Sequence, residues 1–280
     1  MNRRFLQEKS DIVILLTQNV RIKSLFIRRS QVSAKIILPN RNEGGYAMEK
    51  VHPKPIDGTL RKFSLRVPEV IRECSGIKIF GKRIKSLVFT TDVAIIRNVN
   101  ADAVIAVYPF TPQPVITQAI LSVSDIPVFV GVGGGLTQGA RVHALSASAE
   151  MQGAMGVVLN APTSNETIKR ISDTIEIPAV VTVVRDDEDI DARIEAGTKI
   201  FNVSAAAKTP EVVRMIRKKY HDIPIIATGG PTDESILETI RAGANAITWT
   251  PPSNGEIFKS VMERYRNGEA HTEPATVNVE

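Results

Sequence analysis

The sequence predicts a closed (β/α)8 barrel, the TIM-barrel architecture, preceded by a short N-terminal lead-in. Two observations predict it. Eight apolar, strand-like runs follow one another at intervals of roughly 20–28 residues, beginning with IKSLVFTT at 84–91. Two kinds of strand start also alternate along the chain. One is an acid followed by Ile-Pro, at 125, 176 and 222, and the other is rich in Ala and Gly, at 101, 153, 196 and 242.

The runs are typical of parallel strands that are covered on both faces. They consist mainly of Val and Ile without polar alternation, as expected when both faces of a strand are buried. Proline at the first residue of a strand loses no ladder hydrogen bond. A doubly wound open sheet is the competing fold. An open sheet would not require eight evenly spaced units or two alternating strand types. A barrel explains the alternation, because its interior layers come from alternate strands.

Helix start signals separate the runs. An N-cap residue followed by proline, or a capping box with glutamate three residues later, stands before four of the helical segments. These signals are Thr111-Pro112, Thr163 with Glu166, Thr209-Pro210 and Ser253 with Glu256. Apolar residues then recur on one helix face, such as Ile257, Phe258, Val261 and Met262 in the last segment.

We divide the chain into four parts. Residues 1–47 form a basic extension, 48–83 the lead-in, 84–268 the barrel and 269–280 a disordered tail. Within the lead-in, Pro68 and Gly76 mark the ends of a short helix. The following IKIFGKRI predicts a small hairpin that covers the N-terminal end of the barrel.

Composition excludes several classes of protein. The chain has 280 residues, 43% of them hydrophobic but only 5% aromatic, so Val, Ile, Ala and Leu must build a large core. Its single cysteine, Cys74, cannot form an internal disulfide, which fits a reducing cytoplasm. The four histidines lack zinc-like spacing, so they predict no metal site. No apolar run approaches the ~20 residues that span a bilayer, and we expect a cytoplasmic protein without a membrane partner.

The net charge of +5 is concentrated at the N-terminus. Residues 1–47 hold nine Lys/Arg and three acids, a net of +6, and the other 233 residues therefore carry −1. A basic protein would ordinarily suggest nucleic acid as a partner. Because the bulk of the chain is close to neutral, we expect no nucleic-acid partner.

The closed barrel selects candidate site residues by position, because barrel enzymes carry their chemistry at the C-terminal ends of the strands. Side-chain alternation sharpens the choice. On the sixth strand Phe201 and Val203 suit the helix-covered side, so Asn202 and Ser204 should point inward. The same alternation gives three further inward polar residues, which are Thr228, Thr248 and Thr250.

Four strand ends carry the predicted catalytic groups, which are Asp92, Asn160, Arg185 and Asn202. Asp92, an acid beside threonines, is the best candidate for a general base. Arg185 is the best candidate to fix a substrate anion. Asp186 and Asp187 offer carboxylate oxygens to Mg²⁺, although such a charge run is also typical of a solvated loop. No lysine stands at an inward strand end, which argues against a Schiff-base aldolase.

Gly229-Gly230 stands where the seventh strand passes into a helix near Thr232. Glycines let a backbone approach a ligand closely, N–H groups at a helix start attract an anion, and the loops after strands 7 and 8 are the usual phosphate site of this fold. The alternative is a tight turn that needs glycine for its conformation, with Asp233 and Glu234 complementing the helix dipole. The predicted binding set is Gly133, Gly134, Ser204, Thr228, Gly229, Gly230, Thr250 and Ser253, in which the glycine-rich GVGGGLTQG loop after the third strand is a second wall or a lid.

The segment IPIIATGG…ESILETIRAGANAI resembles the strand 7–helix–strand 8 signature of the phosphate-binding (ribulose-phosphate-binding-like) barrels. That superfamily includes ribulose-phosphate-type epimerases, thiazole and thiamine-phosphate synthases, sugar-phosphate aldolases and FMN-dependent oxidoreductases. Two positions depart from its pattern. Pro231 follows the glycines, and TWTPPS at 248–253 replaces the usual Gly-Ser or Gly-Thr pair. The whole chain also resembles a bacterial barrel family without an assigned reaction that is provisionally labelled hydrolase.

The residues and the resemblance together predict an enzyme that acts on a small phosphorylated or carboxylated metabolite by acid–base chemistry, as an isomerase, lyase or hydrolase. Two alternatives stay open, an FMN-binding oxidoreductase and a non-catalytic barrel that senses a metabolite. No cofactor is certain. Because the usual end of strand 8 is missing, we expect no bound flavin. Self-association into a homo-oligomer also stays open.

The basic extension has two readings. NEGGYAM at 42–48 ends in Met48, and Asn-Glu-Gly-Gly can be encoded by a run that contains a strong bacterial ribosome-binding sequence. Translation would then start at Met48, with residues 1–47 being upstream DNA read in frame. The alternative is a genuine basic extension, and codons at 42–45 without a GGAGG-like run would remove the first reading.

A chain of residues 48–280 should fold and behave in solution as residues 1–280 do, because the lead-in and the barrel both follow Met48. Size-exclusion chromatography and thermal unfolding of the two chains check this expectation. If the shorter chain is insoluble while the longer one is a well-behaved monomer or dimer, residues 1–47 are part of the fold.

Overall fold

The computed structural model describes residues 52–54, 56 and 65–269, which include the whole barrel. The predicted basic extension 1–47 and tail residues 270–280 lie outside the described residues. Within the described part, no helix is long and apolar enough to cross a membrane.

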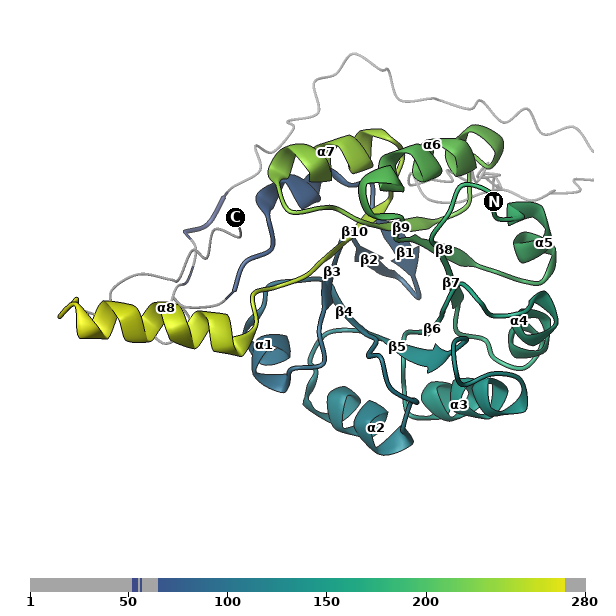
Figure 1. The fold of residues 1–280 in the computed structure, drawn as a ribbon, viewed down its shortest axis with the longest axis horizontal. Helices are drawn as coiled ribbons and strands as arrows, with labels where there is room; N and C mark the ends of the chain where they lie inside the picture. The colour runs from purple at the N-terminus through teal and green to yellow at the C-terminus, as the bar shows by residue number, and fades with distance from the viewer. Residues whose placement is uncertain (1–51, 55, 57–64, 270–280) are drawn as a thin grey trace, which may run out of the picture. The chain divides into compact units, whose positions relative to one another are not determined.

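Eight parallel strands form a closed barrel (Figure 1). Each strand pairs with the strand next to it in sequence, and the last pairs with the first to close the ring. The predicted (β/α)8 barrel is therefore confirmed. The strands are β3 (Ser86–Phe89), β4 (Ala103–Ala106), β5 (Val128–Gly133), β6 (Gly156–Leu159), β7 (Ala179–Val183), β8 (Ile200–Val203), β9 (Ile225–Thr228) and β10 (Ala246–Trp249).

A helix follows each strand of the barrel. The helices are α1 (Val93–Asn98), α2 (Pro114–Val123), α3 (Ala140–Met151), α4 (Asn165–Ser172), α5 (Ile190–Glu195), α6 (Thr209–Lys219), α7 (Asp233–Arg241) and α8 (Asn254–Arg266), and a 3-10 turn, η3 (Ala206–Lys208), precedes α6. The lead-in contributes a 3-10 helix, η2 (Glu69–Glu73), and an antiparallel hairpin of β1 (Ile77–Ile79) and β2 (Lys82–Ile84). A short helix and a hairpin are the two elements that the sequence predicted there.

Side-chain alternation gives each strand an inner and an outer face. Outward residues such as Val203 and Ile247 pack with the helices in one core. Inward residues such as Phe129 and Ile226 form a second core inside the barrel. The isoleucines of the β1–β2 hairpin belong to this inner core. The hairpin therefore closes the N-terminal end of the barrel and leaves the C-terminal end for a site.

Two of the predicted helix starts are shifted along the chain. α2 begins at Pro114 with Gln113 as its N-cap, rather than at Thr111-Pro112. Proline still occupies the first helical position, where its missing N–H costs nothing. Ser164 caps α4 in place of Thr163. The Thr163 hydroxyl donates instead to the carbonyl three residues before it, which removes it from the capping position.

The two remaining start signals lie at or within one residue of their predicted places. Thr209 is the first residue of α6 rather than its N-cap, and its hydroxyl accepts a hydrogen bond from the Ala205 N–H at 3.0 Å. Ser253 and Glu256 form the predicted capping box of α8. The Glu256 carboxylate accepts from the Ser253 N–H at 2.7 Å, so the first turn of α8 is firmly defined.

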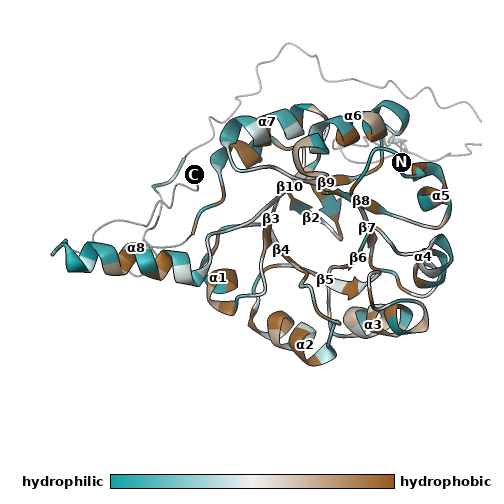
Figure 2. Cartoon of the chain, viewed as in Figure 1, coloured by the Kyte–Doolittle hydropathy of each residue, from teal (hydrophilic) through white to brown (hydrophobic). Residues whose placement is uncertain are grey.

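α8 packs differently from the other helices of the barrel. None of its side chains is buried, and the helix runs away from the ring formed by the other helices (Figures 1 and 2). Val67, Ile71 and Cys74 of the lead-in pack in the outer core, which also contains Val88 of β3. Each of the helices α1 to α7 buries at least one side chain, so α8 is the exception among the helices of the described barrel.

Candidate functional site at the C-terminal end of the barrel

Four neighbouring strands each point one polar side chain into the C-terminal half of the barrel. These side chains are Thr182 on β7, Asn202 on β8, Thr228 on β9 and Thr248 on β10. Strand register brings them together, since Asn202 lies opposite Thr182 and Thr248 lies opposite Thr228. The outer-core packing of its two neighbours on β8 leaves Asn202 facing inward, as alternation predicted.

The other half of the barrel interior is apolar. Strands β3 to β6 contribute Leu87, Ile105, Phe129 and Val158 to the inner core. No charged residue stands at an inward position on any of the eight described strands. These four side chains are at most 2% exposed, so they fill the interior of the barrel, and the strand side chains above them are uncharged.

Asn202 and Thr248 retain unused hydrogen-bonding capacity. Asn202 Nδ2 donates to Thr182 Oγ1 at 3.3 Å, but Asn202 Oδ1 has no partner among the described residues. Thr248 Oγ1 also has none there, whereas Thr228 Oγ1 lies 3.2 Å from Thr209 Oγ1. The two residues are only 9% and 7% exposed. A buried polar group without a partner costs about 1–3 kcal/mol, so these atoms are suited to receive a group from a ligand.

A cavity of about 150 Å³ opens at the ends of β4, β5 and β6. Two predicted site residues, Gly133 and Asn160, line it together with Tyr108. Gly134 serves the loop itself. Its φ is +104°, and a Cβ there would lie 1.9 Å from Thr163 Oγ1, so no other residue fits. The glycine-rich loop after β5 thus forms one wall of this cavity.

Packing and backbone conformation account for both glycines after β9. A Cβ on Gly229 would lie 2.7 Å from Ile236 and 2.8 Å from Ile247, so α7 can approach β10 only without that carbon. Gly230 has a φ of +81°, which glycine adopts without strain. These contacts support the alternative of a turn that needs glycine, and an anion at this place stays a prediction.

The start of α7 combines unoccupied N–H donors with negative charge. Thr232 and Ser235 exchange hydrogen bonds in a capping box, which occupies their N–H groups. The N–H groups of Gly230, Asp233 and Glu234 have no acceptor among the described residues. These donors attract an anion. The exposed carboxylates of Asp233 and Glu234 repel one, so the two effects oppose each other.

The residues that follow β10 form the start of α8. Ser253 caps that helix, and its hydrogen bonds to Glu256 lower the pKa of the Glu256 carboxyl. The carboxylate is therefore charged at neutral pH. Pro251 and Pro252 have no N–H to donate. After β10, the exposed Thr250 hydroxyl is the group that can donate a hydrogen bond to the predicted anion.

Asp92, the predicted general base, is the N-cap of α1. Its Oδ1 accepts from the N–H groups of Ala94 and Ile95 at 2.8 and 3.2 Å. Its Oδ2 accepts from Asn254 Nδ2 at 2.5 Å. Both carboxylate oxygens are engaged, so Asp92 can take a proton from a substrate only after it exchanges one of these bonds. Its catalytic role stays a prediction.

The predicted charged residues after β7 face solvent. Arg185 forms an ion pair of 3.0 Å with Asp187, and Lys208 lies 3.6 Å from Asp186. Within the described part of the chain, no group of three or more His, Cys, Asp or Glu could hold a metal. Ser204 follows β8 and is half-buried. The roles of Arg185 and Ser204 in binding stay predictions.

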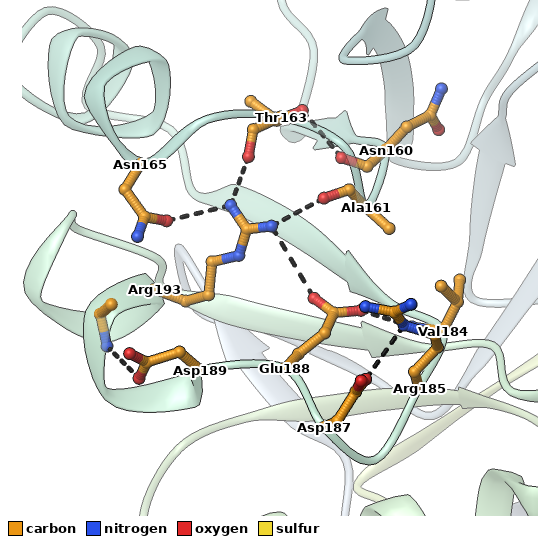
Figure 3. A network of polar contacts seen from close by, with 11 residues as sticks. Asn160, Ala161, Thr163, Asn165, Val184, Arg185, Asp187, Glu188, Asp189 and Arg193 are labelled. Carbon is orange, nitrogen blue, oxygen red and sulfur yellow. Dashed lines mark hydrogen bonds and ion pairs between the residues drawn. The ribbon is translucent and has the colours of Figure 1, made fainter.

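A cleft that the sequence did not indicate lies between the β6–α4 and β7–α5 loops (Figure 3). Its volume is about 260 Å³, and Glu188 and Arg193 line it. The Arg193 guanidinium donates to the carbonyls of Ala161 and Thr163 and lies 3.8 Å from Glu188 Oε2. The side chains of Glu188 and Arg193 are 10% and 14% exposed. The pair holds the two loops together, and nothing in RDDEDID distinguishes its one buried acid from its solvated ones.

Comparisons with known proteins show the fold. No protein-family model and no curated protein matches the sequence. A Burkholderia cenocepacia J2315 protein provisionally described as a phosphonomutase has a TM-score of 0.53 at 14% identity, over 65% of this chain and 93% of the other. A phosphonopyruvate hydrolase in complex with oxalate and Mg²⁺ has a TM-score of 0.51 at 13% identity, over 68% and 84%. A 2,3-dimethylmalate lyase of the PEP mutase/isocitrate lyase superfamily has 0.53 at 11%, over 74% and 89%. At these identities the three proteins share the barrel fold with this chain, and membership of the phosphate-binding superfamily stays a prediction.

Thr248→Val should raise the free energy of unfolding of the purified protein by about 1 kcal/mol, because it removes a buried hydroxyl that has no partner. Thr209→Val is the matched control. It removes an equally buried hydroxyl that is hydrogen-bonded, and it should lower the free energy of unfolding by about 1 kcal/mol. Chemical denaturation of both variants measures the two signs. Equal losses would show that the Thr248 hydroxyl is satisfied within the fold.

Proposed function

We propose that the chain is an enzyme that acts on a small phosphorylated or carboxylated metabolite by acid–base chemistry at the C-terminal end of its barrel. The reaction is that of an isomerase, a lyase or a hydrolase. One observation carries the proposal. Asn202 Oδ1 and Thr248 Oγ1 are buried without partners among the described residues, at the end of the barrel where this fold binds substrates. Stability alone would favour apolar residues there, and functional sites are where such costs are retained.

The positions of these groups suggest how a metabolite lies at the C-terminal end of the barrel. Its carbon skeleton lies in the cavity lined by Val107 and Tyr108, and a hydroxyl or carbonyl oxygen reaches Asn202 and Thr248. Its anionic group lies at the start of α7, where the Gly230 N–H and the next unoccupied donors point. Four further residues of the predicted binding set lie at the ends of β8, β9 and β10, and they are Ser204, Thr228, Gly229 and Thr250.

Acid–base chemistry is assigned to the predicted strand-end groups. Asp92 takes up a proton after the substrate displaces the Asn254 amide from Oδ2. Asn160 lines the adjacent cavity and orients the substrate from the opposite side. Arg185 is exposed, and its guanidinium binds an anion once it leaves Asp187. These roles are proposals that rest on position and chemical type.

The structural neighbours support the proposed substrate class by analogy of fold. A phosphonopyruvate hydrolase and a 2,3-dimethylmalate lyase both act, by their names, on small carboxylated molecules. The hydrolase structure also contains Mg²⁺. In this chain Asp186 and Asp187 would be its ligands, but each carboxylate is paired with a basic side chain. The described residues therefore do not fit a preformed magnesium site, and no step is assigned to a metal.

A non-catalytic barrel that senses a metabolite is the second candidate. One observation favours it: the inward side chains of the described strands are uncharged, and Asp92, the acid that follows β3, is engaged as a helix cap. Such a protein would bind without turnover. Bound flavin is not expected, because Pro231, Pro251 and Pro252 supply no N–H to its phosphate. For either function we propose a cytoplasmic location.

Inorganic phosphate and glycerol phosphate should raise the melting temperature of the wild type. At 100 times its dissociation constant a ligand stabilises the fold by about 2.7 kcal/mol, enough for a clear thermal shift. Gly230→Asp should abolish the shift, because it places a carboxylate beside the predicted anion. Gly230→Ala is the matched control, since it has the same positive φ and meets the same Ser235 side chain without adding charge. Both variants should melt lower without ligand, but only the alanine variant should still respond to phosphate.

Asp92→Asn separates binding from chemistry in the same assay. The amide should leave the phosphate shift in place and remove any turnover of phosphorylated or carboxylated metabolites. The anion site is disproved if the wild type shows no shift with either ligand, or if Gly230→Asp responds as the alanine variant does. A full shift without turnover in the wild type would favour the sensor.

A further inference from the structure

The cavity at the ends of β4, β5 and β6 suits an uncharged group better than an anionic one. Its volume is about 150 Å³, and an apolar cavity of about that size holds a benzene ring. Among the described residues that line it, none is charged. A phosphate or carboxylate placed there would lose its hydration without gaining a charged partner, which is costly.

Gly135 leaves space open in this cavity, although the fold does not require a glycine there. Its φ lies outside the left-handed region. A Cβ at this position would meet nothing among the described residues nearer than Asn160 Nδ2, at 3.8 Å, which is an ordinary contact. Gly133 and Gly134 differ, because both have a positive φ and a Cβ on either would collide with neighbouring atoms. A bound group explains the space at Gly135, which neither backbone conformation nor packing explains.

Two large apolar side chains in the wall of the same cavity face water. Phe110 in the β4–α2 loop is 74% exposed, and Leu136 in the β5–α3 loop is 99% exposed. Single exposed apolar residues are common on protein surfaces. These two come from different loops and line one cavity. An apolar group bound beside them would remove part of both side chains from water, which favours binding.

The cavity and the start of α7 belong to opposite sides of the barrel. In the closed ring of strands β5 stands four places from β9, so the two strands face each other across the barrel (Figure 1). Gly135 follows β5, whereas Gly230 follows β9. Asn202 and Thr248 lie on the two strands that flank β9. A substrate whose anionic group lies at the start of α7 would therefore extend its other end toward the cavity.

We propose that the substrate carries an uncharged apolar group of about six carbons, a phenyl or branched alkyl group, and that this cavity binds it. Gly135 sets the size of the group that fits. The inference rests on the proposed function, because it takes the anionic group of the substrate to lie at the start of α7. It narrows the substrate class to carboxylates or phosphates that have an apolar end.

Isothermal titration of the full chain with two matched pairs of probes tests the inference. One pair is acetate and phenylacetate, and the other is methyl phosphate and phenyl phosphate. The members of a pair share the anionic group and differ in the phenyl ring. The wild type should bind the phenyl member of at least one pair about tenfold more tightly or better, because the ring leaves water for the cavity.

Gly135→Leu should remove this preference and leave the affinity for acetate and methyl phosphate unchanged, because the leucine side chain occupies the cavity. Gly255→Leu is the matched control. It makes the same change on α8, where a Cβ would meet only Ser253 Oγ at 3.9 Å, and it should keep the preference. Leu136→Ser should lose part of the preference without loss of the fold, since the leucine is 99% exposed.

The outcomes separate this inference from the proposed function. Equal affinities within both pairs in the wild type would overturn the inference and leave the proposed anion site standing. If none of the four compounds binds, the anion site is wrong and the inference falls with it. A preference that persists in Gly135→Leu would place the phenyl ring elsewhere and overturn the inference. Should Gly135→Leu fail to fold, an unchanged preference in Leu136→Ser would overturn it instead.

Discussion

β10 pairs with β3 in parallel, and this pairing gives every strand of the sheet two hydrogen-bonded neighbours. Because all eight pairings are parallel, the C-terminal strand ends lie at one end of the barrel, while the β1–β2 hairpin closes the other. Closure also decides which side chains meet. It sets the polar residues of β7 to β10 opposite the apolar residues of β3 to β6 across a narrow interior. The candidate site is a consequence of that geometry.

Polar groups around the rim of this site are mostly used by the fold itself. Asp92 caps α1, Ser253 and Glu256 define the start of α8, and Arg193 joins two loops. A group held in this way positions the backbone and has little capacity left for a ligand. Asn202 and Thr248 differ because they are buried and incompletely bonded. In physical terms they weaken the empty protein and strengthen a complex, which is the balance expected of binding residues.

The barrel could be predicted from the sequence because the signals are local and repeated. The alternation of Phe201, Asn202 and Val203 fixes which side chain points inward, and the structure agrees. The sequence did not show which of several possible partners a polar side chain would bind. Thr163 bonds a backbone carbonyl instead of capping α4, and nothing in a charge run marks Glu188 as buried. The outward course of α8 was not visible either, because Ile257, Phe258, Val261 and Met262 have the same spacing as the apolar residues of helices that do bury side chains.

A crystal structure of the protein with a metabolite that raises its melting temperature tests the central claim most directly. The account predicts a ligand oxygen about 2.7–3.2 Å from both Asn202 Oδ1 or Nδ2 and Thr248 Oγ1. The anionic group of the ligand should lie at the start of α7. A metabolite bound in the cleft beside Glu188 and Arg193, with the groups of Asn202 and Thr248 untouched, would contradict it.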